Sequence, residues 1–118
     1  MAALTLQNID PAGLTPSYSA VNSQDTVAIS TGQRVFLHVK NGGGGSINVT
    51  ITAVKTAATV AGVGGVTISD QVVAVGAGSE EMIGPFTEAF MDTDGVVTID
   101  YSGTTSVTAA ALQLPAQY

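Results

Sequence analysis

The sequence predicts an all-β protein, a single-domain antiparallel β-sandwich that is jelly-roll-like, with roughly seven to nine strands. Three observations lead to this prediction. Several short segments alternate apolar and polar residues with a period of two, as strands with one buried face do. Turn-forming glycine, proline, asparagine and aspartate separate these segments. No segment keeps the 3.6-residue apolar period of an amphipathic helix.

The clearest strands flank a glycine run at residues 42–45. Residues 34–40 alternate between an aliphatic face and a face of basic and aromatic side chains. The aliphatic face consists of Val35, Leu37 and Val39, and the other face of Arg34, Phe36, His38 and Lys40. After the glycines, Ile47, Val49 and Ile51 alternate with polar residues. We therefore predict a strand, a glycine turn and a second strand antiparallel to the first.

The N-terminal part divides into a short strand at residues 3–9 and an irregular segment at residues 11–25. Glycine, proline, serine, asparagine and alanine make up most of the irregular segment, and Leu14, Tyr18 and Val21 are spaced along it. We interpret residues 1–25 as an N-terminal strand with an extended arm, and residues 26–118 as the β-sandwich domain. The arm lies either on a partner or on its own domain. Its candidate partner contacts are Leu14, Tyr18 and Val21.

The remaining strands follow the same pattern. We predict strands at residues 26–30, at 66–75 with a break near Asp70, at 80–86, at 97–101 and at 107–114. Pro85 cannot donate a ladder hydrogen bond, so the strand before it should lie at a sheet edge. We interpret the last two strands as an antiparallel pair. The expected core contains Val35, Leu37, Val39, Ile47, Val49, Ile51, Val97, Ile99 and Leu112.

Composition limits the possible partners of this chain of 118 residues. Nine acidic and three basic residues give a net charge of −6, which disfavours nucleic acid as a partner. Charged residues make up only 10%, against roughly 25% in average soluble domains, so much of the surface must be uncharged. Without cysteine there is no disulfide or thiolate site. No signal peptide and no apolar run of ~20 residues is visible, so we expect a soluble protein made in a cytoplasm, with no membrane partner.

Neither catalysis nor cofactor or metal binding is expected from the motifs. His38 is the single histidine and has the position of a structural imidazole on a strand, and no serine lies in a Gly-x-Ser-x-Gly turn. Asp92 and Asp94 precede Gly95 as in the opening of a calcium loop, but the further ligands of that loop do not follow. A type I′ hairpin turn explains the same residues. We therefore expect a protein that is not an enzyme.

Several stretches resemble small accessory head proteins of tailed bacteriophages, above all capsid decoration (cement) proteins. These stretches are residues 32–43, 47–51, 81–86 and 95–103, with Val107 and Leu114. The resemblance covers about half of the chain and is of moderate specificity. It implies a structural virion protein that binds the major capsid protein on the capsid exterior and stabilises the head. The alternatives are a head–tail connector or tail subunit, a virion-displayed carbohydrate-binding or adhesin module, or an unrelated bacterial β-domain.

Self-association is the last expectation from the sequence. A chain with few charges has few means of keeping bare sheet edges of two copies apart. A symmetric oligomer would also add several weak contacts to a repeating lattice. We therefore expect a homotrimer or another small symmetric homo-oligomer.

Overall fold

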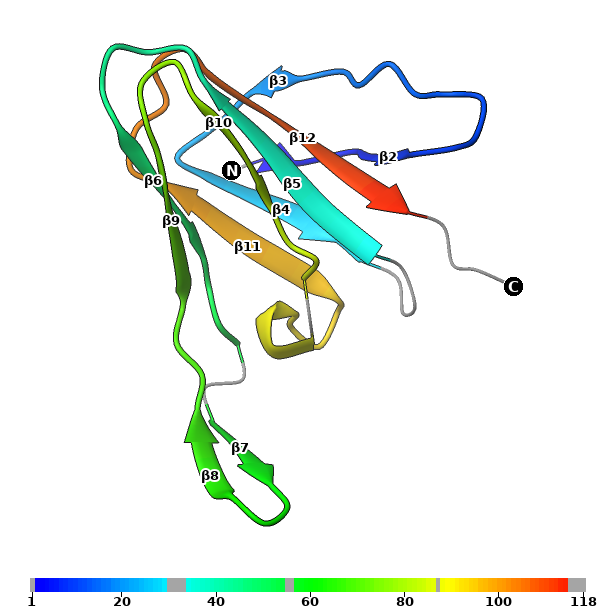
Figure 1. The fold of residues 1–118 in the computed structure, drawn as a ribbon, viewed down its shortest axis with the longest axis vertical. Coiled ribbons are helices and arrows are strands. Elements are labelled where there is room, and N and C mark those ends of the chain that lie inside the picture. Colours follow the sequence, from blue (N-terminus) through cyan, green and yellow to red (C-terminus); the bar gives the residue numbers. More distant parts are fainter. Residues whose placement is uncertain (1, 30–33, 55–56, 87, 115–118) are drawn as a thin grey trace.

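The computed structural model describes residues 2–29, 34–54, 57–86 and 88–114. Two sheets pack face to face, and a separate two-stranded hairpin extends from one end (Figure 1). Sheet A has the order β1 (Ala2–Ala3), β4 (Gln24–Ala28), β11 (Val96–Tyr101), β6 (Ile47–Ile51) and β9 (Gln71–Val75). Sheet B has the order β10 (Glu80–Ile83), β5 (Arg34–Asn41), β12 (Val107–Leu114) and β2 (Leu6–Asn8), with β3 (Ser19–Ala20) also paired to β12.

The hairpin consists of β7 (Ala57–Val60) and β8 (Gly64–Thr67), and a single 3₁₀ turn, η1 (Glu88–Phe90), precedes β11. The β1–β4 and β2–β12 pairs are parallel, and the other strand pairs are antiparallel. The predicted all-β sandwich is thus confirmed. The described residues form twelve strands, more than the seven to nine expected, because strands of two or three residues leave no alternation to detect. No helix in this part of the chain is long and apolar enough to cross a membrane.

The core lies between the two sheets and is aliphatic. All nine predicted core residues are buried, and the inward side chains of β5, β6 and β11 form its centre. Leu112 differs from the other eight in its location. It is only 4% exposed, but it is not part of the cluster between the sheets. Side chains on a strand alternate between faces, so Leu112 points to the outer face of sheet B, opposite to Ala109 and Ala111.

The predicted pairing of the strands around the glycine run was wrong. β5 pairs with β10 and β12 in sheet B, whereas β6 pairs with β11 and β9 in sheet A. The predicted pair of β11 and β12 is split between the sheets in the same way. Alternation shows that both strands present an apolar face to a core, and strands on opposite sides of that core satisfy this equally well. Consecutive strands β4, β5 and β6 thus alternate between the sheets, as in a jelly roll.

The glycine run crosses from one sheet to the other. The buried Asn41 side chain donates to the carbonyl oxygens of Gly45 at 2.8 Å and Val75 at 3.1 Å, and accepts from the Gly43 N–H at 3.0 Å. A Cβ on Gly43 would lie 2.8 Å from the Thr105 carbonyl oxygen. Close approach of two loops, and not a positive φ, therefore requires glycine here.

The N-terminal segment is more closely joined to the sandwich than the predicted arm. β1 pairs with β4, β2 and β3 pair with β12, and β4 already begins at Gln24. Residues 1–25 therefore contribute strands to both sheets. The longest stretch without a strand in this segment is residues 9–18, called loop 9–18 below. Ser30, the last residue of the strand predicted at 26–30, lies outside the described residues, as does Lys55.

The edge position predicted for the strand before Pro85 is confirmed, because β10 pairs with β5 alone. Gly84 has a φ of +140°, and a Cβ there would come within 2.7 Å of the Phe36 Cβ. A residue with a side chain would therefore push the end of β10 away from β5.

Candidate functional site

The two outer faces of the sandwich differ in chemistry. The outer face of sheet A is mostly polar, with Gln24, Thr26, Asn48, Thr50, Val72, Ala74, Thr98 and Asp100. Its polar groups bond to one another. The Asp100 carboxylate accepts from the Gln24 amide at 2.9 Å and from the Thr52 hydroxyl at 3.2 Å. On face A, as we call it, the carboxylate of Asp100 is therefore satisfied by neighbouring side chains.

The outer face of sheet B, called face B below, combines a polar end and an apolar end. Its side chains come from β10, β5 and β12, which lie side by side in register. They are Arg34, Phe36, His38, Lys40, Glu80, Met82, Thr108, Ala110, Leu112 and Leu114. Ala110 and Leu112 are only 2% and 4% exposed, although they point away from the core of the sandwich. Part of face B is thus covered within the single chain.

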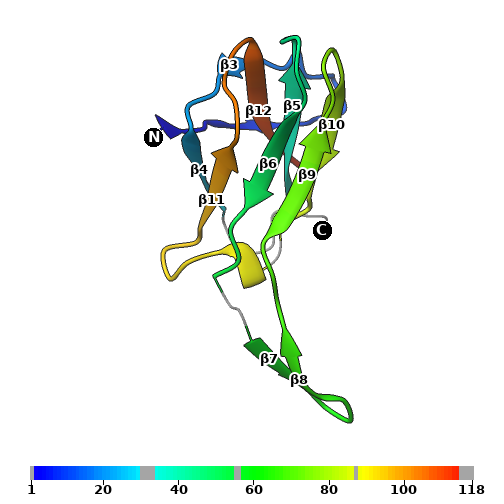
Figure 2. The ribbon, with the colours of Figure 1, turned by 90° about the vertical axis from the view of Figure 1, so that its left-hand side faces the viewer.

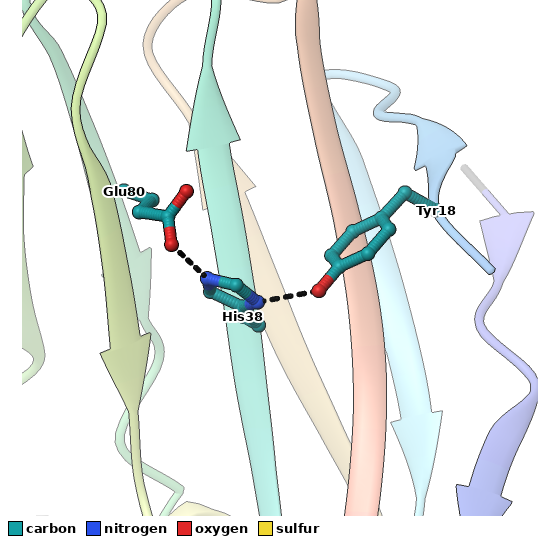
Figure 3. A network of polar contacts seen from close by, with 3 residues as sticks. All are labelled: Tyr18, His38 and Glu80. Carbon is teal, nitrogen blue, oxygen red and sulfur yellow. Dashed lines mark hydrogen bonds and ion pairs between the residues drawn. The ribbon is translucent and has the colours of Figure 1, made fainter. Parts of the chain in front are cut away.

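The polar end of face B is a chain of three side chains (Figure 3). The Tyr18 hydroxyl lies 2.6 Å from His38 Nδ1, and His38 Nε2 lies 3.2 Å from a carboxylate oxygen of Glu80. A neutral imidazole with its proton on Nε2 satisfies both contacts, because Tyr18 then donates to Nδ1 and Nε2–H donates to Glu80. His38 is buried and held from both sides, as predicted for a structural imidazole.

Two further contacts fix the end of loop 9–18 on sheet B. The Lys40 ammonium lies 3.9 Å from the centre of the Tyr18 ring, a cation–π geometry. The Gln7 side chain donates to the Ser17 carbonyl oxygen and accepts from the Ser17 N–H, both at 2.8 Å. Tyr18 is therefore the anchor that ties the loop to the face, with its ring at an angle to that of His38.

The three predicted contact residues have different surroundings. Leu14 lies in loop 9–18 and is half-buried, and Tyr18 is half-buried on face B. Val21 is buried in the core, and its N–H donates to the Val107 carbonyl oxygen at 3.1 Å. Val21 therefore serves the fold and is not available to a partner. Leu14 and Tyr18 remain as candidates on one loop.

The apolar end of face B forms a groove of about 420 Å³. We call it the groove; its lining residues are Arg34, Phe36, Met82, Gly84, Pro85 and Leu114. Met82 is 64% exposed, an unusual position for a large apolar side chain. The groove could not be predicted from the sequence, because its residues come from β5, from β10 and the two residues after Ile83, and from β12, which are far apart in the chain. The outward positions of Phe36 and Leu114 were the only available signal.

A buried polar pair lies inside the sandwich. The fully buried Asp25 carboxylate accepts from the Asn22 side-chain amide at 3.1 Å and the Asn22 N–H at 3.3 Å. The Tyr101 hydroxyl is buried without a hydrogen-bond partner in the described part of the chain. Burial, and to a smaller extent the charge of Asp25, raises the pKa of Tyr101 far above its ordinary value.

The Asp92 side chain has a structural role in the turn that precedes β11. Its Oδ1 accepts from the N–H groups of Asp94 at 2.8 Å and Val96 at 3.0 Å. In the described ranges no cluster of three or more metal-ligating side chains occurs. Gly95 has a φ of +77°, whereas Asp94 does not have a positive φ, so this is not the type I′ turn that we expected.

Comparison of the chain with family models, with curated proteins and with solved structures found no match. Face B offers an exposed apolar groove, and its residue Met82 lies opposite His38, which Tyr18 contacts.

Proposed function

We propose that this chain is a bacteriophage capsid decoration protein, which binds the exterior of an assembled head and stabilises it without catalysing a reaction. The observation that carries the proposal is face B, an outer sheet face with exposed apolar side chains in a chain with little surface charge. The class of partner comes from the resemblance of residues 32–43, 47–51, 81–86 and 95–103, with Val107 and Leu114, to small phage head proteins. The proposed partner is the major capsid protein.

Loop 9–18 is the proposed contact with the head. Its end is fixed by Tyr18, so the loop loses little conformational entropy on binding. Leu14 then offers an apolar side chain close to that anchor, and apolar anchors dominate the affinity of small interfaces. The capsid presents the same site many times, so a small oligomer of the chain would bind with avidity.

Cosedimentation with phage heads assembled without this protein tests the proposal. The full chain should coat the heads and raise the temperature at which they burst. Leu14→Asp should weaken coating by about tenfold or more, since it places a charge in the apolar contact. The matched control Val72→Asp, on face A, should coat as the unchanged chain does.

Two results would refute the proposal in different ways. If the full chain does not coat heads, or coats them without raising the bursting temperature, decoration is the wrong function. If Leu14→Asp coats as well as Val72→Asp does, loop 9–18 is not the contact. A deletion of residues 1–25 is unsuitable as a test, because it removes β1, β2, β3 and the start of β4.

A further inference from the structure

In the part of the chain that the structure describes, the β7–β8 hairpin has no partner strand outside itself. Its strands pair with each other from Ala57↔Thr67 to Val60↔Gly64, and neither pairs with a third strand. Figure 2 shows the hairpin standing away from the sandwich along the long axis of the molecule. An isolated two-stranded hairpin is marginally stable in water, because it has no layer to pack against. A second surface that covers it would stabilise it.

The composition of the hairpin indicates which kind of surface could cover it. Residues 56–69 contain no charged side chain, although the chain as a whole has a net charge of −6. At the tip, Val63 is 74% exposed. Uncharged apolar segments lose little hydration energy on contact, and they avoid the repulsion between two acidic molecules. The hairpin is therefore suited to an apolar surface without carboxylates.

The groove on face B has these properties. Among the described residues that line it, Arg34 is the one charged side chain and none is a carboxylate. β10, which contributes Met82 to the groove, pairs with β5 alone among the described strands, so its other edge is free. An edge strand has unpaired backbone donors and acceptors, which an added strand can use. The groove and this edge together offer apolar contact and backbone hydrogen bonds to an uncharged β-ribbon.

We propose that the hairpin of one copy docks in the groove of a second copy of this chain. The hairpin continues from β6 and β9 of sheet A, whereas the groove lies on the outer side of sheet B. The two surfaces are thus on opposite layers of one molecule and meet most directly between molecules. A contact between two different surfaces is heterologous, and it closes into a ring such as a trimer if the rotation permits.

The inference specifies the contact within the homo-oligomer expected from the proposed function, but it does not depend on the capsid. Sedimentation velocity of the full chain at micromolar concentration tests it. The unchanged chain should form a closed oligomer. Val63→Asp in the hairpin and Met82→Glu in the groove should each weaken self-association by about tenfold or more. Both side chains are largely exposed, so their melting temperatures should stay near that of the unchanged chain.

Mixing the two variants tests the head-to-tail arrangement. A Val63→Asp chain keeps an intact groove and a Met82→Glu chain keeps an intact hairpin, so an equimolar mixture should form a one-to-one dimer. Val72→Asp, which is 53% exposed on face A, serves as the matched control and should assemble normally. A monomeric unchanged chain, variants that still assemble, or a mixture without dimers would each overturn the inference. Head binding by the monomeric variants shows separately whether the proposed function holds.

Discussion

Face A and face B belong to the same sandwich and are built from strands of similar length, yet they differ in how their side chains are satisfied. On face A, Asp100 accepts hydrogen bonds from Gln24 of β4 and from Thr52, which follows β6. On face B, Leu112 is buried although it points outward, and Met82 is exposed although it is apolar. The difference teaches that the charged side chain of face A is satisfied by its neighbours, whereas the outward apolar side chains of face B are covered at one part and exposed at another. A second molecule that covers the groove on face B would remove these exposed apolar side chains from water.

The largest expected effect is on the covered part of face B. Leu112→Ala should lower the free energy of unfolding by about 2–5 kcal/mol, as for a core leucine, because the side chain is buried. Val72→Ala on face A should change it by less than about 0.5 kcal/mol. Urea unfolding of both variants measures this difference. Equal losses at the two positions would show that the faces do not differ in burial.

The pH dependence of the free energy of unfolding tests a residue of the interior, Tyr101, and not a residue of either face. The folded chain holds the Tyr101 proton more tightly than the unfolded chain, because burial raises this pKa. The protonated Tyr101 side chain therefore makes its full contribution to the free energy of unfolding below about pH 10. Above that pH, this contribution decreases by up to about 1.4 kcal/mol per pH unit.

Unfolding free energies between neutral and alkaline pH check this effect. Tyr101→Phe should remove this part of the dependence of the unfolding free energy on alkaline pH. At pH 7 it should not be strongly destabilising, because the hydroxyl has no hydrogen-bond partner in the described residues. Tyr18→Phe on face B should keep the slope. If Tyr101→Phe leaves the alkaline slope unchanged, the loss of stability arises elsewhere.

A smaller effect is expected at the anchor of loop 9–18. Tyr18→Phe removes the hydroxyl next to His38 Nδ1 and should cost about 0.5–1.5 kcal/mol, the usual value of one hydrogen bond. The ring and its contact with Lys40 remain in this variant. The His38 ring proton signals in an NMR spectrum should shift as well. An unchanged stability together with unchanged His38 signals would contradict the anchor.

The smallest effect is expected for polar bonds on face A. Thr52→Val keeps the shape of the side chain but removes the bond to Asp100, which is still held by Gln24. We expect a change of less than about 0.5 kcal/mol, because water replaces the lost donor at this half-exposed position. The same unfolding experiment measures this change. If Thr52→Val costs as much stability as Tyr18→Phe, polar contacts on the two faces do not differ in their contribution to stability.

The sequence predicts the sandwich well because alternation is a local property. Val35, Leu37 and Val39 point to the core as their spacing indicates, and Phe36 and His38 point outward. Strand partners are not local, so the two strands around the glycine run were wrongly paired. Burial of Val21 was missed for the same reason, since a single apolar residue in an irregular segment does not reveal what it packs against.

The candidate site was predictable only in part. Tyr18 stood out in the sequence, but its contact with His38 and Lys40 requires that the end of loop 9–18 returns to sheet B. The groove requires that β5, β10 and β12 lie side by side, and no local pattern contains that information. The hairpin at 57–67 lies in a segment rich in alanine and glycine, whose weak side-chain pattern gave no strand prediction over residues 55–65.

Single-cysteine labelling tests most directly whether loop 9–18, and not face A, meets the partner. The chain has no cysteine, so Leu14→Cys in the loop and Val72→Cys on face A can each be labelled with a maleimide without background. Labelling rates are compared for the free protein and for protein bound to heads. We predict that binding slows labelling at position 14 by about tenfold or more and leaves position 72 unchanged. Protection at position 72 with free labelling at position 14 would contradict the assignment.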